Sequence, residues 1–433
     1  MIGPRRAPRS MTGSVPPPTA AGSSKRAYYH LYAAQVLALV STGIATIALA
    51  LLAYRLAGGD AGAVLGTAFA IKMLAYLTIA PIAAAFVERL PRRALLVGLD
   101  LVRAAVVLAL PWVTQVWQVY VLILAFQAAS AVFTPTFQAT IPDLLPDEKD
   151  YTKALARSRL AHELENAVSP LLAAALLTVV SSRGVFITAM IGLLVSAALI
   201  IVVTLPDPSV APRSSVRDRL TRGLRAFLAT PRLRGLLALN LAVAAGTAMV
   251  VVNTVVLVQA RYGLGEEETA LALAAFGIGS VLAALILPRV LEAVPERTAM
   301  LTGAGLVAGG LLGGIVLPGY GALLPLWFAL GVGCSLGQTP AGGLLRRSAA
   351  REDRQYLYAA QFALAHGCLL ITYPLAGWLG ASAGLKIDFG VLGLIALAAV
   401  LVAARLWSHA DPAPVEDVEL TPEDVLSRPN GSG

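Results

Sequence analysis

Four ionisable residues stand inside long apolar stretches of this 433-residue chain, where they could bind and release protons. Lys72 lies in TAFAIKMLAYLTIA, with no acidic residue within one helical turn, and His162, Glu163 and Glu165 cluster in ALARSRLAHELENAV. An ionisable side chain in apolar surroundings is costly, so it usually has a partner or a function. Because carboxylates beside a histidine that titrates near neutrality suit proton transfer, we predict this role for all four residues.

Each of these residues also has a simpler interpretation. Lys72 could reach an interface with its ammonium group or pack uncharged, and it could instead attract an anionic ligand. The two acids could pair with neighbouring basic side chains. Asp100 and Arg103 are three positions apart, and we expect them to face each other as a structural ion pair.

The chain carries no recognisable enzyme motif. It has no H-E-x-x-H sequence, no phosphate-binding loop and no convincing nucleophile triad. His162–Glu163 lacks the second histidine that a zinc site would need. Cys334 and Cys368 lie in apolar runs and give no disulfide framework. We therefore predict no catalytic, metal-binding or cofactor-binding residues and no cofactor, and an intramembrane enzyme is the least favoured class.

The elements that hold these residues are built for a membrane. Hydrophobic residues make up 57% of the chain and charged residues only 13%, whereas soluble proteins carry about 25% charged residues. A helix that crosses lipid needs about 20 mostly apolar residues. We predict an all-α membrane protein with twelve transmembrane helices, at residues 30–54, 61–86, 94–114, 117–140, 153–180, 184–204, 234–258, 268–288, 298–318, 321–344, 357–380 and 387–408.

The positive charges indicate which way these spans run. With an even number of spans, both chain ends lie on one side, and only four of the 33 Lys and Arg residues fall in the loops of the other side: Arg55, Arg183, Arg261 and Lys386. Because basic residues concentrate on the cytoplasmic side, we predict a multi-pass protein of a bacterial inner membrane with both termini in the cytoplasm. The net charge of +8 then reflects topology, and we predict contact with the lipid bilayer and no nucleic-acid partner.

The second half of the chain repeats the first at a constant offset of 204 residues. VERLPRRALLV (87–97) recurs as LEAVPERTAML (291–301), and the segment from Ala154 aligns with that from Tyr358. One offset across several elements predicts two six-helix bundles related in parallel. The predicted domains are a disordered cytoplasmic tail at 1–27, an N-terminal bundle at 28–204, a basic cytoplasmic linker at 205–233, a C-terminal bundle at 234–409 and a cytoplasmic tail at 410–433.

This arrangement resembles the major facilitator superfamily over about residues 28–409. The family's charged elbow has the form G-x-x-x-D-R-x-G-R-R. Here the matching positions are Ala84, Glu88, Arg89, Pro91, Arg92 and Arg93. The acid and the three basic positions match, and the two glycines are replaced. LPRRALLVGLDLVRA, FTPTFQATIPDLLPDE and RGLRAFLATPRLRGLL are similar to the branch that contains the enterobactin exporter and related multidrug proton antiporters.

The resemblance implies that the elbow is a cytoplasmic latch between the bundles. Glu88 would face the N-terminal end of span 357–380, where free N–H groups favour negative charge. The arginines would pair with Asp100 and with carboxylates of neighbouring loops, and the second elbow would act against span 153–180. The predicted latch residues are Glu88, Arg89, Arg92, Arg93, Asp100, Arg103, Glu292 and Arg297.

The resemblance further implies a secondary active transporter that works by alternating access. We expect a monomer that exports a small organic compound (a drug, siderophore or secondary metabolite) in exchange for protons. Uncharged polar residues would line its cavity, although each could instead join two helices by a hydrogen bond. The cavity candidates are Gln35, Gln127, Ser130, Asn240, Asn253, Gln338, Gln361 and Tyr373. The alternative is efflux of nickel or cobalt, for which the chain offers only four histidines.

Overall fold

The computed structural model describes residues 18–87, 90–145, 175–205, 216–348 and 354–407, together with single positions at 147, 150, 151, 153, 154, 157, 158, 161, 165, 169, 172 and 173. Within these residues the chain is almost entirely helical, without any strand. Nine of the helical stretches described are long and apolar enough to cross a membrane. A helix satisfies its own backbone hydrogen bonds in lipid. A chain as apolar as this one therefore forms helices.

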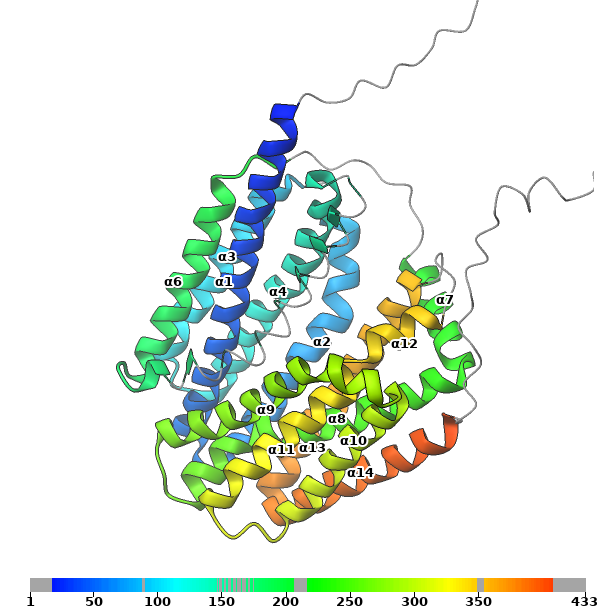
Figure 1. Cartoon of the computed structure of the whole chain (residues 1–433). Helices are drawn as coiled ribbons and strands as arrows, with labels where there is room; N and C mark the ends of the chain where they lie inside the picture. The colour runs from blue at the N-terminus through cyan, green and yellow to red at the C-terminus, as the bar shows by residue number, and fades with distance from the viewer. Residues whose placement is uncertain are drawn as a thin grey trace, which may run out of the picture.

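The first half of the chain forms an upright group of helices, coloured blue to green in Figure 1. Its members are α1 (Pro18–Ala57), α2 (Ala61–Val87), α3 (Arg92–Ala109), α4 (Val116–Leu144) and α6 (Ser182–Ile201), with the 3-10 turns η1 (Gly58–Asp60) and η2 (Leu110–Trp112). α1 packs on α6, α3 packs on α4 and α6, and α2 packs on α4. We refer to these helices as the first group.

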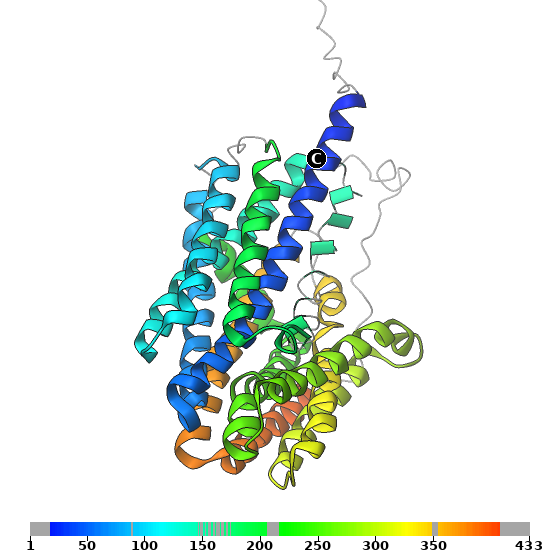
Figure 2. The ribbon, with the colours of Figure 1, turned by 90° about the vertical axis from the view of Figure 1, so that its left-hand side faces the viewer.

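The second half forms another group, which lies at a steep angle to the first (Figures 1 and 2). Its members are α8 (Pro231–Val255), the π-helical turn η3 (Val256–Arg261), α9 (Glu266–Ala293), α10 (Glu296–Gly314), α11 (Tyr320–Gln338), α12 (Ala341–Arg347), α13 (Arg354–Ala383) and α14 (Leu385–Leu406). α14 packs on α8 and α10, and α11 packs on α9 and α10. We refer to these helices as the second group.

Between the groups lies α7 (Val216–Ala229), in the basic linker. Its sequence predicts an amphipathic helix, and the structure contains that helix, with Phe227 fully buried. α7 packs on the beginning of α13, where the Arg222 guanidinium lies 5.2 Å from the centroid of the Tyr356 ring. The linker helix therefore belongs physically to the second group.

Most of the predicted spans coincide with described helices. Span 153–180 lies largely outside the described residues, so the total of twelve stays a prediction. α1 begins at Pro18, within the segment predicted to be a disordered tail. Part of the reason is an ion pair, since Lys25 Nζ lies 2.8 Å from Asp150 Oδ2. The Lys25 ammonium also lowers the pKa of the Asp150 carboxyl below its usual value. The other domain boundaries stay predictions.

The two groups meet chiefly where α2 runs beside α13 in the opposite direction. Small residues allow the close approach: a β-carbon on Gly66 would lie 2.5 Å from the carbonyl oxygen of Tyr373. Next to this close approach, Trp378 Nε1 of α13 donates to Thr67 Oγ1 of α2 at 3.0 Å. We call the end of each group that carries Pro18 or Trp407 its terminus end, and the end with η1, η3 and the α13–α14 turn its opposite end.

Candidate functional site

The structure brings together two of the four residues that the sequence predicts to bind protons. Lys72 lies near the middle of α2, and Glu165 lies in span 153–180; both side chains are half-buried. The Lys72 ammonium and the Glu165 carboxylate are close enough to attract each other electrostatically, and Arg103 also acts on Glu165. His162 and Glu163 lie outside the described residues. That these residues carry protons stays a prediction.

Glu165 lies close to α1 at Gly43, which has no side chain. A β-carbon on Gly43 would lie 3.4 Å from Glu165 Cγ and 2.1 Å from Ser169 Oγ. The absence of a side chain at Gly43 therefore lets the helix that carries Glu165 and Ser169 approach α1 closely. The acid is thereby placed inside the first group.

Aromatic residues extend this site toward the second group. Tyr76 lies one turn after Lys72 on α2, and its ring centroid is 5.6 Å from that of His366 and 6.3 Å from that of Phe362, both on α13. His366 Nδ1 donates to the Phe362 carbonyl at 2.8 Å. The charged pair and the contact between the groups are therefore adjacent.

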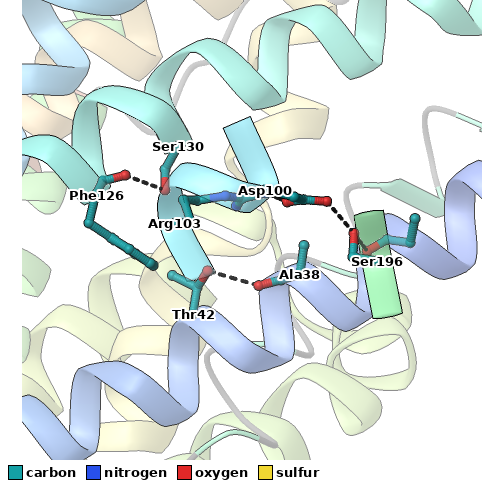
Figure 3. Close-up of polar contacts among 8 residues, drawn as sticks. Ala38, Thr42, Asp100, Arg103, Phe126, Ser130 and Ser196 are labelled. Carbon is teal, nitrogen blue, oxygen red and sulfur yellow. Dashed lines mark hydrogen bonds and ion pairs between the residues drawn. The ribbon is translucent and has the colours of Figure 1, made fainter. Parts of the chain in front are cut away.

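The predicted pair of Asp100 and Arg103 is present and buried in α3. Asp100 Oδ2 also accepts a hydrogen bond from Ser196 Oγ of α6 at 2.7 Å. The Arg103 guanidinium lies 4.2 Å above the centroid of the Phe133 ring of α4. Figure 3 shows Arg103 and Ser196 on either side of Asp100. The pair thus ties α3 to α4 and α6, which is a structural role.

The first elbow is described only in part. Arg92 forms an ion pair with Asp143 at the terminus end of α4, in agreement with the expectation that these arginines meet neighbouring carboxylates. Arg93 is exposed. Glu88 and Arg89 lie outside the described residues, so their part in a latch stays a prediction.

The described contacts of the second elbow lie within the second group. Arg297 Nε donates to the carbonyl of Trp407 at 2.7 Å, at the end of α14. The last turn of a helix leaves carbonyls unsatisfied and attracts cations, which explains this contact. Span 153–180 lies largely outside the described residues, so the expected action of this elbow against it stays a prediction. Glu292 is exposed, whereas Glu296 forms an ion pair with Arg347.

Four of the uncharged cavity candidates form hydrogen bonds, pack on a neighbouring ring or line a crevice. Gln35 Nε2 of α1 donates to Ser158 Oγ of span 153–180 at 2.7 Å, whereas Ser130 Oγ donates within α4, to the carbonyl of Phe126 at 2.9 Å. Tyr373 is buried with its ring centroid 5.1 Å from that of Phe69. Gln127 lines a small crevice of the first group. Other residues of that crevice include Thr42, Thr46, Phe69, Val107 and Phe126.

The remaining candidates belong to the second group. Asn240 is buried in α8, and neither atom of its amide has a hydrogen-bond partner among the described residues. Gln338 is exposed at the end of α11, and Gln361 on α13 is half-buried. Asn253 Nδ2 donates to Asp388 Oδ2 at 2.7 Å. Within the described part of the chain, no three His, Cys, Asp or Glu side chains come together as metal ligands.

Sequence reasoning missed Tyr76, His366 and Asp388. Tyr76 gives no signal until α2 and α13 are known to be neighbours, whereas His366 occupies the repeat position of His162 and could have been found from the 204-residue offset. Asp388 also gave a signal, because it is an acid within the predicted span 387–408, just as Lys72 is a base within span 61–86. It was missed because it stands in the first turn of its helix, where an acid is common.

Two groups of membrane-crossing helices, with ionisable and polar side chains buried within them and at their contact, form the architecture of a multi-pass membrane transporter. Residues 31–265 and 236–429 match the Major Facilitator Superfamily. The chain therefore belongs to this family, which confirms the resemblance drawn from its elbow and repeat. Members of this family bind small-molecule substrates within the membrane.

Curated relatives and solved structures agree with this assignment. Macrolide efflux protein A of Streptococcus pyogenes is 25% identical over 187 residues, covering 42% of this chain and 45% of the relative. The protein of the same name from Enterococcus faecalis is 26% identical over 152 residues, covering 33% and 47%. The chain thus spans about half the length of the curated relatives it matches.

Two solved structures share the fold. A bacterial homologue of the human lysosomal transporter Spinster, in an inward-facing and unoccupied conformation, has a TM-score of 0.71 at 13% identity, covering 92% of this chain and 100% of the other. A POT family transporter in complex with a thioalcohol-conjugated peptide has a TM-score of 0.66 at 12% identity, covering 87% and 95%. At these identities the likeness concerns the fold alone.

Proposed function

We propose that this transporter exports a small amphipathic organic compound in exchange for protons, with Lys72 and Glu165 as the coupling pair. The observation that carries the proposal is that these two side chains, both inside the first group, lie near enough for their charges to interact. Export is supported by the relatives, both of which are efflux proteins by name. Macrolides, which are amphipathic organic compounds, are accordingly the first cargo class to test.

The pair can respond to a proton because each charge depends on the other. Opposite charges attract strongly where water is scarce, and a charge that loses its partner there becomes costly. A proton that binds Glu165 removes the attraction and leaves the Lys72 ammonium without a counter-charge. The Lys72 side chain must then move, lose its proton or find another anion. Proton binding on one helix thereby changes the state of α2.

A change in α2 reaches the second group through Tyr76. This residue lies one turn from Lys72 and packs on His366 and Phe362 of α13. Alternating access in this fold requires the two groups to rock against each other, and α2–α13 is a main contact between them. The proposed coupling therefore runs from Glu165 to Lys72, then to Tyr76 and α13.

The crevice around Gln127 suits a cargo with few charges. One glutamine and two threonines provide hydrogen-bonding groups, and the remaining lining is aliphatic or aromatic. The composition of this lining suits a small molecule, because apolar surface gives affinity and a few polar groups set orientation. Its volume of about 10 Å³ in this structure is that of a single water, so binding of the cargo would require the surrounding helices to separate. We place the cargo between this crevice and the Lys72–Glu165 pair.

The orientation is part of the proposal. The terminus ends would face the cytoplasm of a bacterial cell and the opposite ends its exterior, because the basic residues concentrate near the termini. The protein would act as a monomer, since each chain supplies both helix groups that alternating access requires.

Transport by purified protein in liposomes tests the coupling. We expect a pH gradient to drive uptake of a radiolabelled macrolide by the wild type. Glu165→Gln and Lys72→Met should each lower this pH-driven rate more than about tenfold, since a charge pair within the membrane is worth more than ~1.4 kcal/mol. Exchange of macrolide down its own gradient should persist. Glu267→Gln, an exposed acid in the first turn of α9, is the control and should resemble the wild type.

Two results would contradict the proposal. Full pH-driven transport by both variants would remove Lys72 and Glu165 as the coupling pair. Transport of nickel or cobalt, but of no organic compound in a panel of antibiotics and siderophores, would favour the metal alternative.

A further inference from the structure

A buried carboxyl group in the second group is not used by the proposed coupling pair. Asp388 stands in the first turn of α14, and its exposed fraction is 0%. Its Oδ2 accepts one hydrogen bond, from Asn253 Nδ2 of α8 at 2.7 Å. Its Oδ1 has no hydrogen-bond partner among the described residues. An ionised carboxylate needs a cation or several donors when water is excluded, so this surrounding suits the neutral acid.

No described charged side chain compensates Asp388. α8, α10 and α13 surround the beginning of α14, and α8 contributes Asn253 and α13 the backbone at Gly380. Lys386, two residues before Asp388, is exposed, and Arg261 of η3 points to the Leu317 carbonyl. The other charged residues of the three surrounding helices lie near their terminus ends: Arg232, Arg234, Glu296, Arg297 and Arg354.

The amide that holds Asp388 also lies at the contact between the two groups. Asn253 Nδ2 lies 3.1 Å from the Ala376 carbonyl of α13, to which it also donates. On its other side is the beginning of α2, where a β-carbon on Gly62 would lie 2.7 Å from Asn253 Oδ1. α2 of the first group therefore covers the Asn253–Asp388 pair. If α2 moved away from α13, water would reach this pair.

From this geometry we propose that Asp388 is a proton-binding site linked to the contact between α2 and α13 at the opposite end. The carboxyl holds its proton while α2 covers Asn253, as in this structure. When the groups separate at this end, water solvates the carboxylate and the proton leaves to solvent. By linkage, a high proton concentration favours the closed contact and a low one favours its opening. This site lies in the second group and does not require Lys72 or Glu165.

Distance measurements between the groups test the link. Spin labels at Gly59→Cys in η1 and Ala383→Cys at the end of α13, both exposed, would report the separation of the opposite ends in lipid nanodiscs. Cys334 and Cys368 would be replaced by alanine. We expect the wild type to shift from a short to a long distance as pH rises from about 5 to 9. Asp388→Asn, which mimics the neutral acid, should stay at the short distance throughout, and Glu267→Gln should shift as the wild type does.

A second variant keeps the test decisive if Asp388→Asn is not stable. Asn253→Ala retains the acid but removes the hydrogen bond that favours its ionised form, so the midpoint of the shift should rise by about one pH unit. A shift that is unchanged in both variants would overturn the proposal. So would a shift that follows sodium at constant pH, which would make Asp388 a sodium site. The shift should persist in Lys72→Met/Glu165→Gln, which separates this proposal from the coupling pair.

Discussion

Gly377 of α13 lies so close to α2 that a β-carbon on it would be only 2.2 Å from the carbonyl oxygen of Gly62. The two groups are therefore joined here by backbone against backbone, without intervening side chains. Interfaces of this kind are common between membrane helices, where dispersion contacts and close approach replace the hydrophobic effect. A side chain at this position must push the groups apart.

Gly377→Ala should therefore weaken the contact between α2 and α13. We expect a loss of about 1–3 kcal/mol in stability, as for other overpacked sites, seen as a lower midpoint of thermal unfolding in detergent. The matched control is Gly367→Ala on the same helix, because a β-carbon there has no neighbour within 4 Å. The control should be neutral, or more stable by up to ~1 kcal/mol. Equal midpoints for the two variants would contradict the close approach.

Asp100→Asn should destabilise the first group more than the removal of both charges. The single variant leaves the buried Arg103 guanidinium without its counter-charge, which costs about 3–5 kcal/mol. The double variant Asp100→Asn/Arg103→Met leaves no buried charge and should recover part of this loss. The measurement is a double-mutant cycle of thermal unfolding. Additive effects would mean that the two side chains do not interact.

Local sequence spacing predicted the Asp100–Arg103 pair well, because partners three residues apart on one helix must be neighbours. The 204-residue repeat likewise predicted the two groups, since a duplicated chain folds twice in the same way. Lys72 was recognised as a charge within an apolar span, but the sequence did not identify Glu165 as the acid near it. That proximity depends on the rotation of a neighbouring helix, which Gly43 helps to set.

Contacts made across the groups were harder to predict. Asn253 was expected to line a cavity or to join two helices by a hydrogen bond, and it donates to Asp388, which lies 135 positions further along the chain. Arg297 bonds to the end of α14, a contact that its neighbours in the sequence do not indicate. In both cases the residue type was informative, and the partner depended on how helices distant in sequence pack.

The orientation predicts opposite accessibility for two exposed residues. Arg93 lies at the terminus end of the first group, and Lys386 at the opposite end of the second. After replacement by cysteine, the first should react with a membrane-impermeant maleimide only once cells are opened, and the second in intact cells. Labelling of both positions from the same side would contradict the topology. Arg55→Cys, on the same predicted side as Lys386, serves as the positive control.

Because α7 is packed on α13, the covalent connection between the two groups runs from Ile201, where α6 ends, to Val216, where α7 begins. Its roughly 15 residue steps can reach at most about 50 Å when fully extended. The length of this connection sets an upper limit on how far Val216 can move from the end of α6 during a transport cycle. Deleting residues from this connection should restrict the movement of the two groups relative to each other, without changing any residue that contacts the cargo.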